Sequence, residues 1–309
     1  MNFSHNPVML NKVIEGLNIL SDGTYVDCTF GRGGHSKNIL KKIGKRGKLI
    51  AIDKDIEAEN YAKKNFTSDQ RFYFEKSNFS NIEFIINKHC KSKKVNGILL
   101  DLGVSSPQLD DPNRGFSFMR EGPIDMRMDI TNKTTALLWL QKADVEEISM
   151  VLKKYGEEKY SFRIAKKIKH SIENNLLHTT LDLSKIINDC YPKSKLGKKN
   201  PATKSFQAIR IFINNELQEL EKILNNCIDL IDKGGRLVVI SFHSLEDRMV
   251  KNFIKIHSDG KNTISKLPIT GNNQKLSLKK IKIPLKASEN EIENNIRARS
   301  ARIRVAEKI

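Results

Sequence analysis

Short apolar runs and helical periods alternate along the first hundred residues. The runs have the length and composition of buried strands, and they occupy Tyr25-Val26, Lys48–Asp53, Arg71–Glu75 and Gly97–Leu102. The intervening segments space their apolar residues as helices do, over Met9–Leu20, Lys37–Lys42, Ile56–Asn65 and Phe84–Cys90. This pattern predicts a parallel, doubly wound α/β sheet.

The alternation stops near residue 110. From there to Phe212 no convincing strand occurs, and the pattern predicts helices over Val145–Tyr155, Glu157–Glu173 and Leu183–Cys190. Asp144 and Asp182 are expected as N-caps. We therefore expect a helical domain at 110–212, inserted into the sheet domain.

The sheet pattern returns late in the chain. A long helix around Phe206–Ile231 is followed by a strand at Gly234–Ser241, and Ala301, Ile303 and Val305 alternate with Arg302, Arg304 and Ala306 as a half-buried strand would. Ser258–Ser277 is polar and predicts a loop. The sheet domain is thus expected in two parts, 1–109 and 213–309.

Three of the expected strands end in an acid, at Asp27, Asp53 and Asp101. After the first, Gly31, Gly33 and Gly34 precede His35 and a helix. A strand, a glycine loop and a helix bring backbone close to a nucleotide-like ligand, although glycines also form ordinary tight turns.

Asp53 favours the ligand interpretation. It follows Gly34 by 19 residues, near the spacing of about 20 at which an acid reaches the hydroxyl pair of a ribose. The alternative is an N-cap for the helix that begins near Ile56.

The loop also discriminates between ribose ligands. A dinucleotide loop has a third glycine three residues after the second, and here His35-Ser36 follow Gly33-Gly34 instead. Crowded glycines with a polar histidine suit the amino-acid tail of S-adenosylmethionine better than a pyrophosphate. A nicotinamide oxidoreductase is disfavoured by this spacing and not eliminated by it.

Two further residues are candidates for proton transfer. Asp101 ends the fourth strand, where open α/β sheets bind ligands. His243 has the equivalent position on the later strand, with a helix-capping or structural histidine as the alternative. Ser244 and Asp247 form a weak capping box there.

The positive net charge of the chain predicts a polyanionic partner. The formal net charge is +18, and residues 251–309 hold 14 Lys+Arg against 5 Asp+Glu, so half of the excess (14 − 5 = 9) falls in the last fifth of the chain. A localised basic surface favours nucleic acid first and an anionic membrane second.

Two segments fit RNA contacts. In Arg114–Phe118 and Asp125–Asp129, arginines lie beside aromatic or acidic residues, and paired rings could stack bases; a satellite core with a salt-bridged turn is the alternative. Arg302 and Arg304 would share one face of the last strand, which suits phosphate contacts.

The cysteines and the apolar runs indicate the compartment. Cys28, Cys90, Cys190 and Cys227 lack metal-ligand spacing and are expected as free thiols in a reducing, cytoplasmic setting, with no metal. No signal peptide or run of transmembrane length is present in the sequence, so no membrane association is expected.

Taken together, the motifs resemble the MraW family, S-adenosylmethionine-dependent methyltransferases that act on N4 of a cytidine in the decoding region of 16S rRNA. The matching segments run in order over nearly the whole chain: Thr29–Ser36, Ala51–Asp53, Leu100–Asp110, Arg114–Phe118, Asp125–Asp129, Tyr155–Glu158, Pro201–Thr203, Phe206–Ala208, Ile240–Arg248 and Arg297–Ser300. Three positions depart from the family pattern: Lys54 and Lys204 replace arginine, and Ile296 replaces proline.

The resemblance implies a class I (Rossmann-like) methyltransferase core with an inserted helical substrate-recognition domain. It also implies S-adenosylmethionine contacts at Gly33, Gly34, His35, Asp53, Phe79, Asp101 and Gln108. The expected partner is 16S rRNA, within the small ribosomal subunit, bound by a monomer or homodimer.

The residues alone leave other functions open. An assembly factor could grip rRNA through the basic C-terminal region with a vestigial pocket, and a methyltransferase could act on DNA or adenine. Only the family resemblance chooses 16S rRNA.

Overall fold

Two compact units make up the chain. The computed structural model describes residues 7–192, 200–259 and 276–309. The first unit combines 1–103 with 217–309, and the second is 104–216. The inserted unit therefore begins six residues before the expected 110 and ends four residues after the expected 212.

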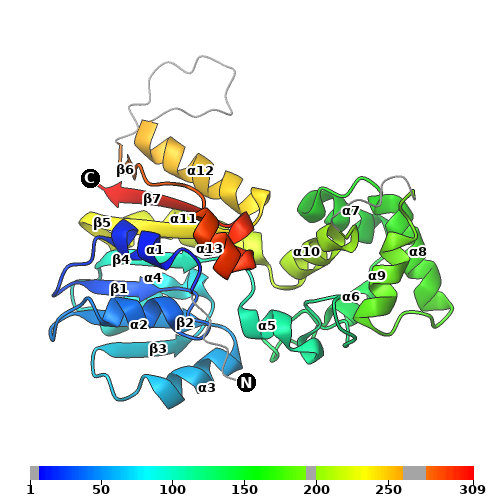
Figure 1. Ribbon diagram of the computed structural model, residues 1–309, viewed down its shortest axis with the longest axis horizontal. Helices are drawn as coiled ribbons and strands as arrows, with labels where there is room; N and C mark the ends of the chain where they lie inside the picture. Colours follow the sequence, from blue (N-terminus) through cyan, green and yellow to red (C-terminus); the bar gives the residue numbers. More distant parts are fainter. Residues whose placement is uncertain (1–6, 193–199, 260–275) are drawn as a thin grey trace. The chain divides into compact units, whose positions relative to one another are not determined.

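A seven-stranded sheet forms the first unit, with strand order β3-β2-β1-β4-β5-β7-β6 (Figure 1). The strands are β1 Thr24–Asp27, β2 Lys48–Asp53, β3 Phe72–Lys76, β4 Val95–Asp101, β5 Ile231–Ser241, β6 Leu278–Ile281 and β7 Arg302–Lys308. The pairs from β3 to β5 are parallel, and β7 is antiparallel to both of its neighbours. The predicted α/β fold class is confirmed.

Helices cover both faces of this sheet (Figure 1). They are α1 Leu10–Leu17, α2 Gly34–Leu40, α3 Ile56–Asn65, α4 Ile82–His89, α11 Glu216–Leu230, α12 Ser244–Asp259 and α13 Glu289–Asn294, with 3-10 turns at Phe79–Asn81 and Ile296–Ser300. Successive strand residues point to opposite faces, so Val26 joins the core under α4, α11 and α12, whereas Tyr25 joins the core under α1, α2 and α3. Burial on both faces explains why these strands are continuously apolar.

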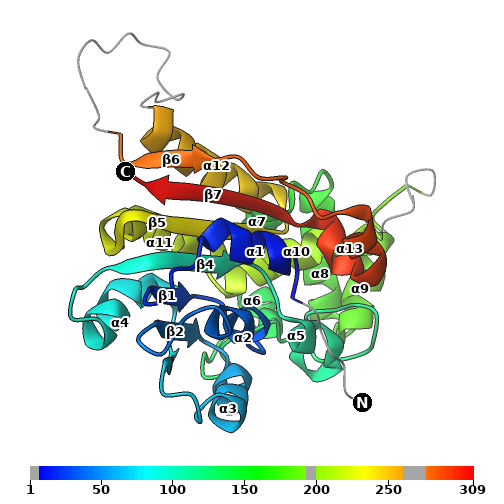
Figure 2. The same ribbon diagram turned by 60° about the vertical axis from the view of Figure 1, so that its left-hand side comes forward.

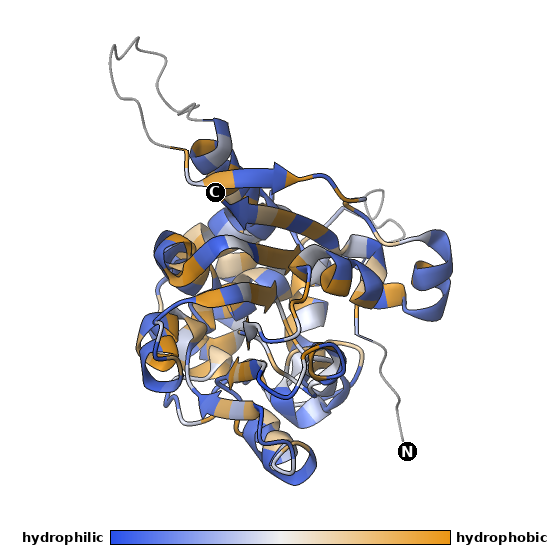
Figure 3. Ribbon diagram, turned by 90° about the vertical axis from the view of Figure 1, so that its left-hand side faces the viewer, coloured by the Kyte–Doolittle hydropathy of each residue, from blue (hydrophilic) through white to orange (hydrophobic). Residues whose placement is uncertain are grey.

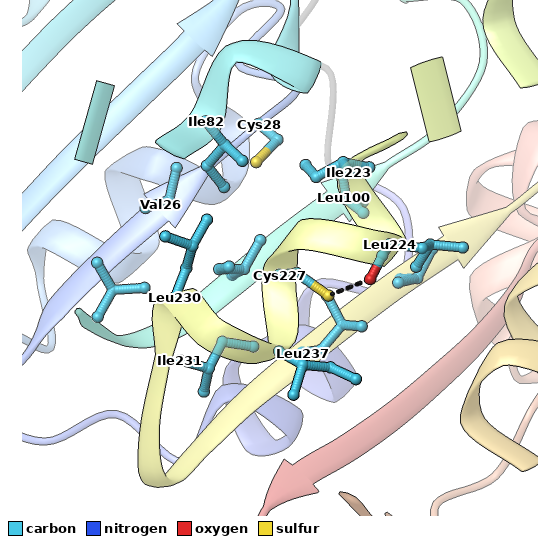
Figure 4. Packing of buried hydrophobic residues seen from close by; sticks show 14 of the residues in the cluster. Val26, Cys28, Ile82, Leu100, Ile223, Leu224, Cys227, Leu230, Ile231 and Leu237 are labelled. Atoms are coloured by element: carbon cyan, nitrogen blue, oxygen red, sulfur yellow. Dashed lines mark hydrogen bonds between the residues drawn. The ribbon is translucent and has the colours of Figure 1, made fainter. Parts of the chain in front are cut away.

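The core under α4, α11 and α12 contains two cysteines. Figure 4 shows Cys28 and Cys227 among apolar side chains such as Ile82 and Leu100, with the Cys227 thiol donating to the Leu224 carbonyl. Burial raises the pKa of Cys227 to about 12. All four cysteines are free and buried. Figure 3 shows hydrophilic residues on the outward faces of the covering helices.

The second unit is helical. It contains α5 Ser106–Asp110, α6 Ala136–Lys142, α7 Val145–Gly156, α8 Ser161–Glu173, α9 Thr180–Asn188 and α10 Ala202–Ile213, with a 3-10 turn at Pro112–Arg114. Its described residues form no named strand, only an isolated bridge between Pro123 and Thr179.

Of the two N-caps expected in this unit, one is confirmed and the other is wrong. Asp144 caps α7 by accepting from the Glu147 N–H at 2.7 Å, as predicted. The prediction for Asp182 is wrong, because Thr179 is the N-cap of α9 and Asp182 is the acidic partner of its capping box. The box satisfies two otherwise unpaired backbone donors.

The expected long helix over Phe206–Ile231 is also wrong, since two helices and the start of β5 occupy that range. Asn214 ends α10, accepting from the Met128 N–H at 2.7 Å and donating to the Met126 carbonyl at 2.7 Å. Asn215 has a left-handed backbone with φ 52°, which asparagine tolerates better than most residues. Apolar periodicity carries no signal for such a break.

Two remaining expectations concern the polar loop and the membrane. The loop predicted for Ser258–Ser277 lies largely outside the described residues, although Ser258 and Asp259 belong to α12. Within the described ranges, every helix is either too short or too polar to cross a bilayer.

Candidate functional site

The glycine loop connects β1 to α2. Gly31 and Gly33 have left-handed backbones with φ 54° and 68°. A Cβ built on Gly33 would lie 2.5 Å from Phe66 Cζ and 2.7 Å from the Phe30 ring. Phe30 in turn packs edge-on against Phe66, with ring centroids 5.1 Å apart. Only glycine fits there, because both the backbone conformation and the aromatic floor exclude a side chain.

Asp53 joins the end of β2 to this loop. Its Oδ2 accepts from the Gly31 N–H at 2.7 Å, and its Oδ1 accepts from the Asp55 N–H at 3.0 Å. The helix-cap alternative is wrong, since Asp55 caps α3 by accepting from the Glu57 N–H. Each carboxylate oxygen has a second lone-pair direction available for a ligand hydroxyl.

Burial raises the pKa of Asp53 from 3.8 to about 6, against the opposing effect of its two backbone hydrogen bonds. A carboxylate kept in a desolvated position is energetically costly, and the nearby Lys54 offsets only part of that cost. Such a position is characteristic of a functional group rather than of a structural one.

Asp27 ends β1 beneath the same loop, and it was not among the predicted site residues. It accepts from the Ser36 hydroxyl at 2.7 Å and from the Thr29 N–H at 3.2 Å. Burial raises its pKa, and the nearby His35 and the Ser36 hydrogen bond act in the opposite direction. Its position at a strand end, shared with Asp53 and Asp101, was the signal available in the sequence.

His35 and Asp101 lie together at the carboxyl ends of β1 and β4. His35 Nε2 is 3.5 Å from Asp101 Oδ2, and the two side chains are 5% and 23% exposed. The Thr29 hydroxyl accepts from the Asp101 N–H at 2.7 Å, which ties the loop to β4. Within the described residues, both ring nitrogens of His35 and the Oδ1 of Asp101 are buried without a hydrogen-bond partner.

Three unsatisfied buried polar atoms in one place require an explanation. Each costs about 1–3 kcal/mol unless a partner is supplied. A ligand with both donors and acceptors, such as the zwitterionic tail of an amino acid, would satisfy them. The residues present therefore fit S-adenosylmethionine, with Asp53 placed for its ribose.

His243 has a structural partner. Its Nε2 lies 3.0 Å from Glu246 Oε1 but has no hydrogen-bond partner among the described residues. Glu246 Oε2 accepts from the N–H groups of Phe242 and His243. His243 Nδ1 accepts from the Glu246 N–H at 3.4 Å. The capping pair at the start of α12 is thus His243 with Glu246, and the expected box of Ser244 with Asp247 is wrong.

The remaining predicted cofactor residues differ in setting. Phe79 begins the 3-10 turn after β3 and packs, half-buried, against the core that includes Ile82. Gln108 belongs to the second unit, where its Oε1 accepts from the Ser105 N–H at 2.9 Å in the capping box of α5.

The arginine-aromatic segment of the second unit is structural. Arg114 is buried and donates to the carbonyls of Arg127 and Met128, both at 3.0 Å. Phe116 is buried, and Phe118 packs edge-on against Phe206. These contacts match the alternative interpretation, a satellite core with a salt-bridged turn. The segment therefore does not present paired rings for base stacking.

The C-terminal arginines also correct an expectation. Arg304 is buried and donates to Asp247 at 2.7 and 3.1 Å, while Arg302 reaches the same carboxylate at 3.4 Å. The two do share a face of β7, toward α12. Arg304 is nevertheless neutralised by Asp247 and is not available for a phosphate.

Comparison with known proteins identifies the family. A model described as the MraW methylase family matches residues 2–309. The chain belongs to the MraW methylase family. It is 48% identical to the ribosomal RNA small subunit methyltransferase H of Shewanella frigidimarina, covering 99% of this chain and 98% of that protein. The proteins of the same name from Coxiella burnetii and Hydrogenovibrio crunogenus are 47% and 46% identical, covering 99% of this chain and 99% and 97% of theirs.

Membership of this methylase family carries S-adenosylmethionine as the cofactor, in agreement with the donors and acceptors at the glycine loop. Among solved structures, the chain is similar to an rRNA methylase of Streptococcus thermophilus, at a TM-score of 0.41 and 10% identity, covering 97% of this chain and 93% of that one.

Proposed function

We propose that this protein transfers a methyl group from S-adenosylmethionine to N4 of a cytidine in the decoding region of 16S rRNA, within the small ribosomal subunit. The observation that carries the proposal is the full-length match to the methylase family, with small-subunit rRNA methyltransferases at 46–48% identity. We further propose that the enzyme acts in the cytoplasm, where its rRNA substrate would be, as a monomer or homodimer. The second unit is the substrate-recognition domain.

The first unit holds the cofactor at the carboxyl ends of β1, β2 and β4. S-adenosylmethionine, when bound, supplies an activated methyl group on a sulfonium. Asp53 binds the ribose hydroxyls, and His35 with Gly33 and Gly34 surrounds the amino-acid tail. The ring of Phe79, half-buried after β3, would lie against the adenine, and Gln108 would be a further contact.

The chain must also position a weak nucleophile. The N4 lone pair of cytosine is delocalised into the ring, so catalysis depends mainly on holding N4 in line with the methyl group, at about 3–3.5 Å. The glycine loop favours this because its backbone can approach the cofactor closely, and a base can reach the methyl group once it is splayed out of the RNA.

Asp101 is the proposed proton acceptor. Its Oδ1 is buried and has no hydrogen-bond partner among the described residues. Because a carboxylate oxygen offers two lone pairs, Oδ1 can contact the cofactor tail with one and take the N4 proton with the other as the methyl group transfers. His243 is the second candidate, and its contacts with Glu246 favour a role in positioning α12 instead.

Methyl mapping tests the function directly. Purified protein and labelled S-adenosylmethionine are incubated with small subunits from a strain that lacks the enzyme, and the rRNA is digested and analysed by mass spectrometry. N4-methylated cytidine in the decoding region is expected. A methyl group on another base, or on another atom of cytidine, would contradict the assignment.

Two rival functions have their own tests. An assembly factor with a vestigial pocket would fail to bind S-adenosylmethionine in calorimetry. A nicotinamide oxidoreductase would change the fluorescence of NADH on titration, which this protein is expected not to do.

A further inference from the structure

A second pocket lies in the first unit, away from the glycine loop. It is enclosed by α12 on one side and by β6 and β7 on the other, three elements that lie side by side in both views (Figures 1 and 2). Its volume is about 270 Å³. Strands β7 and β6 are the last two in the sheet order, whereas the glycine loop is at β1 and β2, so the two sites occupy different parts of the sheet.

The floor of this pocket is aliphatic. Ile254 of α12 is buried in the core on the same face of the sheet as α12. Val305 of β7 and the half-buried Ile281 of β6 also line the pocket, although their side chains pack into the core on the other face, under α1. Leu285 extends the floor toward the opening and is 40% exposed. A partly open apolar floor gains free energy when a flat apolar group covers it, at about 25 cal/mol per Å².

The rim is cationic. Lys251 and Lys255 are four residues apart and therefore lie on one face of α12, and Lys280 faces them from β6. Among the described residues none of these three lysines has an ion-pair partner. Asp259 is the single acid among the lining residues that the structure describes.

Arg304 lines one wall of the pocket, but its positive charge is already neutralised by Asp247. Both of its contacts with Asp247 are hydrogen-bonded, and the guanidinium is buried. The surplus charge of the pocket is therefore that of three lysines against Asp259. Lysine is a flexible point charge that binds phosphate without demanding a fixed geometry.

A pocket with these properties selects a ligand that is anionic at one end and flat and apolar at the other. Its volume is near the lower limit of about 300 Å³ for small-molecule sites, which suits a single nucleotide. We infer that this pocket binds one nucleotide of the RNA substrate, with its phosphate on the lysines and its base and sugar on the aliphatic floor. The inference rests on the proposed function, because it takes the polyanion to be RNA.

Other polyanions fit the surface less well. An anionic membrane would bind a broad, convex basic face, whereas these lysines surround a recess. A free nucleotide shares the ligand chemistry of an RNA nucleotide, and only experiment separates the two sources.

The test compares RNA binding by matched charge variants. Fluorescence anisotropy measures the affinity of the full-length protein for a labelled single-stranded RNA of about ten nucleotides over a range of salt. The pocket variant is Lys251→Gln with Lys280→Gln. The control is Lys91→Gln with Lys233→Gln, two exposed lysines of the same unit outside the pocket, so that both variants lose the same net charge.

We expect the pocket variant to bind RNA about tenfold more weakly, and its salt slope to fall by about 0.7 for each phosphate that a lysine no longer neutralises. The control should stay within about twofold of the parent protein. Equal reductions in affinity for both variants would reduce the effect to net charge and overturn the inference. Thermal melting of both variants checks that neither loses its fold.

A second variant tests the aliphatic floor. Leu285→Ser should weaken binding of the RNA but leave binding of an abasic strand of the same length unchanged, because only the base covers Leu285. Equal effects on both strands would mean that the pocket holds a phosphate alone. That outcome would contradict the nucleotide assignment.

Competition separates the remaining sources. If cytidine monophosphate binds the pocket at concentrations that leave RNA binding unaffected, the site is assigned to a free nucleotide. Loss of binding to phosphatidylserine vesicles in the pocket variant, with RNA binding retained, would assign it to a membrane. Either result overturns the inference.

A methyl-transfer assay distinguishes failure of the pocket inference from failure of the proposed function. If the parent protein methylates small subunits, the pocket variant should show a raised KM for the subunit and an unchanged kcat. A parent protein without methyltransferase activity refutes the proposed function. Normal KM and normal RNA affinity in the pocket variant refute only the pocket.

Discussion

The carboxylate of Asp53 accepts a hydrogen bond from the backbone N–H of Gly31 at 2.7 Å. This contact joins the acid that ends β2 to the loop that follows β1, across 22 residues of sequence. It fixes the acid and the loop in one arrangement, so that the proposed ribose-binding group and the glycine loop form a single site.

Replacing Asp53 tests its part in cofactor binding. Asp53→Asn removes the negative charge that strengthens hydrogen bonds from ribose hydroxyls, so the affinity for S-adenosylmethionine should fall by about ten- to a hundredfold. Isothermal calorimetry measures the change. Glu83→Gln, on the exposed side of α4, is the control, and unchanged affinity in Asp53→Asn would remove Asp53 from the site.

The pH dependence of binding follows from the same group. Burial raises the pKa of Asp53 to about 6, so the carboxylate is ionised above pH 6 and protonated below it. Cofactor affinity should therefore be constant near pH 8 and decline as the pH falls through about 6. Titrations at several pH values check this, and the decline should be absent from Asp53→Asn.

The same shift has a consequence for stability. The folded carboxyl binds its proton more tightly than the unfolded one, so its contribution to the free energy of unfolding decreases as the pH rises from 3.8 to about 6.

Alanine substitutions at Gly33 and Gly234 distinguish the energetic cost of backbone strain from that of steric exclusion. Both have left-handed backbones, with φ 68° and 79°. A Cβ on Gly33 would meet Phe66 and Phe30, whereas one on Gly234 has no described atom within 4 Å. Gly234→Ala should lower the free energy of unfolding by about 1 kcal/mol, and Gly33→Ala by about 2–4 kcal/mol. Urea denaturation measures both, and equal effects would argue against the aromatic floor.

Asp247 holds a buried arginine. Asp247→Asn leaves the buried guanidinium of Arg304 without a counter-charge and should lower the free energy of unfolding by about 3–5 kcal/mol. The exposed ion pair of Lys167 with Asp189 is the comparison. Asp189→Asn should cost less than about 1 kcal/mol by the same denaturation measurement. A small effect in Asp247→Asn would mean that Arg304 finds another partner.

Asp101→Asn tests the proposed proton acceptor. Removal of a general base should lower kcat by about a hundredfold or more, measured at saturating cofactor and small subunits. Full turnover with unchanged cofactor affinity would eliminate the proton role. A lowered affinity with unchanged kcat would leave Asp101 as a cofactor contact only.

Local pattern was sufficient for much of the fold. β2 and α3 have the predicted bounds, because a continuous apolar run and a capped helical period are both encoded in neighbouring residues. The break between α10 and α11 was not predictable from apolar spacing, since Asn214 acts through contacts with Met126 and Met128, more than eighty residues away.

The candidate site was likewise predictable from the sequence only in part. Glycine spacing and the distance to Asp53 are sequence properties, and they are enough to indicate a ribose-containing cofactor. Whether an arginine is free depends on what folds against it. Arg304 has the same sequence setting as a phosphate-binding residue, and Asp247, from a helix 57 residues earlier, neutralises it.

By itself, then, the sequence determined the α/β class, the glycine loop with its acid and the family of the chain, because these depend on residue order and short spacings. The tertiary structure alone decided that His35 and Asp101 face each other with unsatisfied polar atoms, and that Lys251, Lys255 and Lys280 surround one recess. Both depend on which strand ends and helix faces the sheet brings together. The order of the strands, parallel at His35 and Asp101 and antiparallel at the recess, is not encoded in any local pattern.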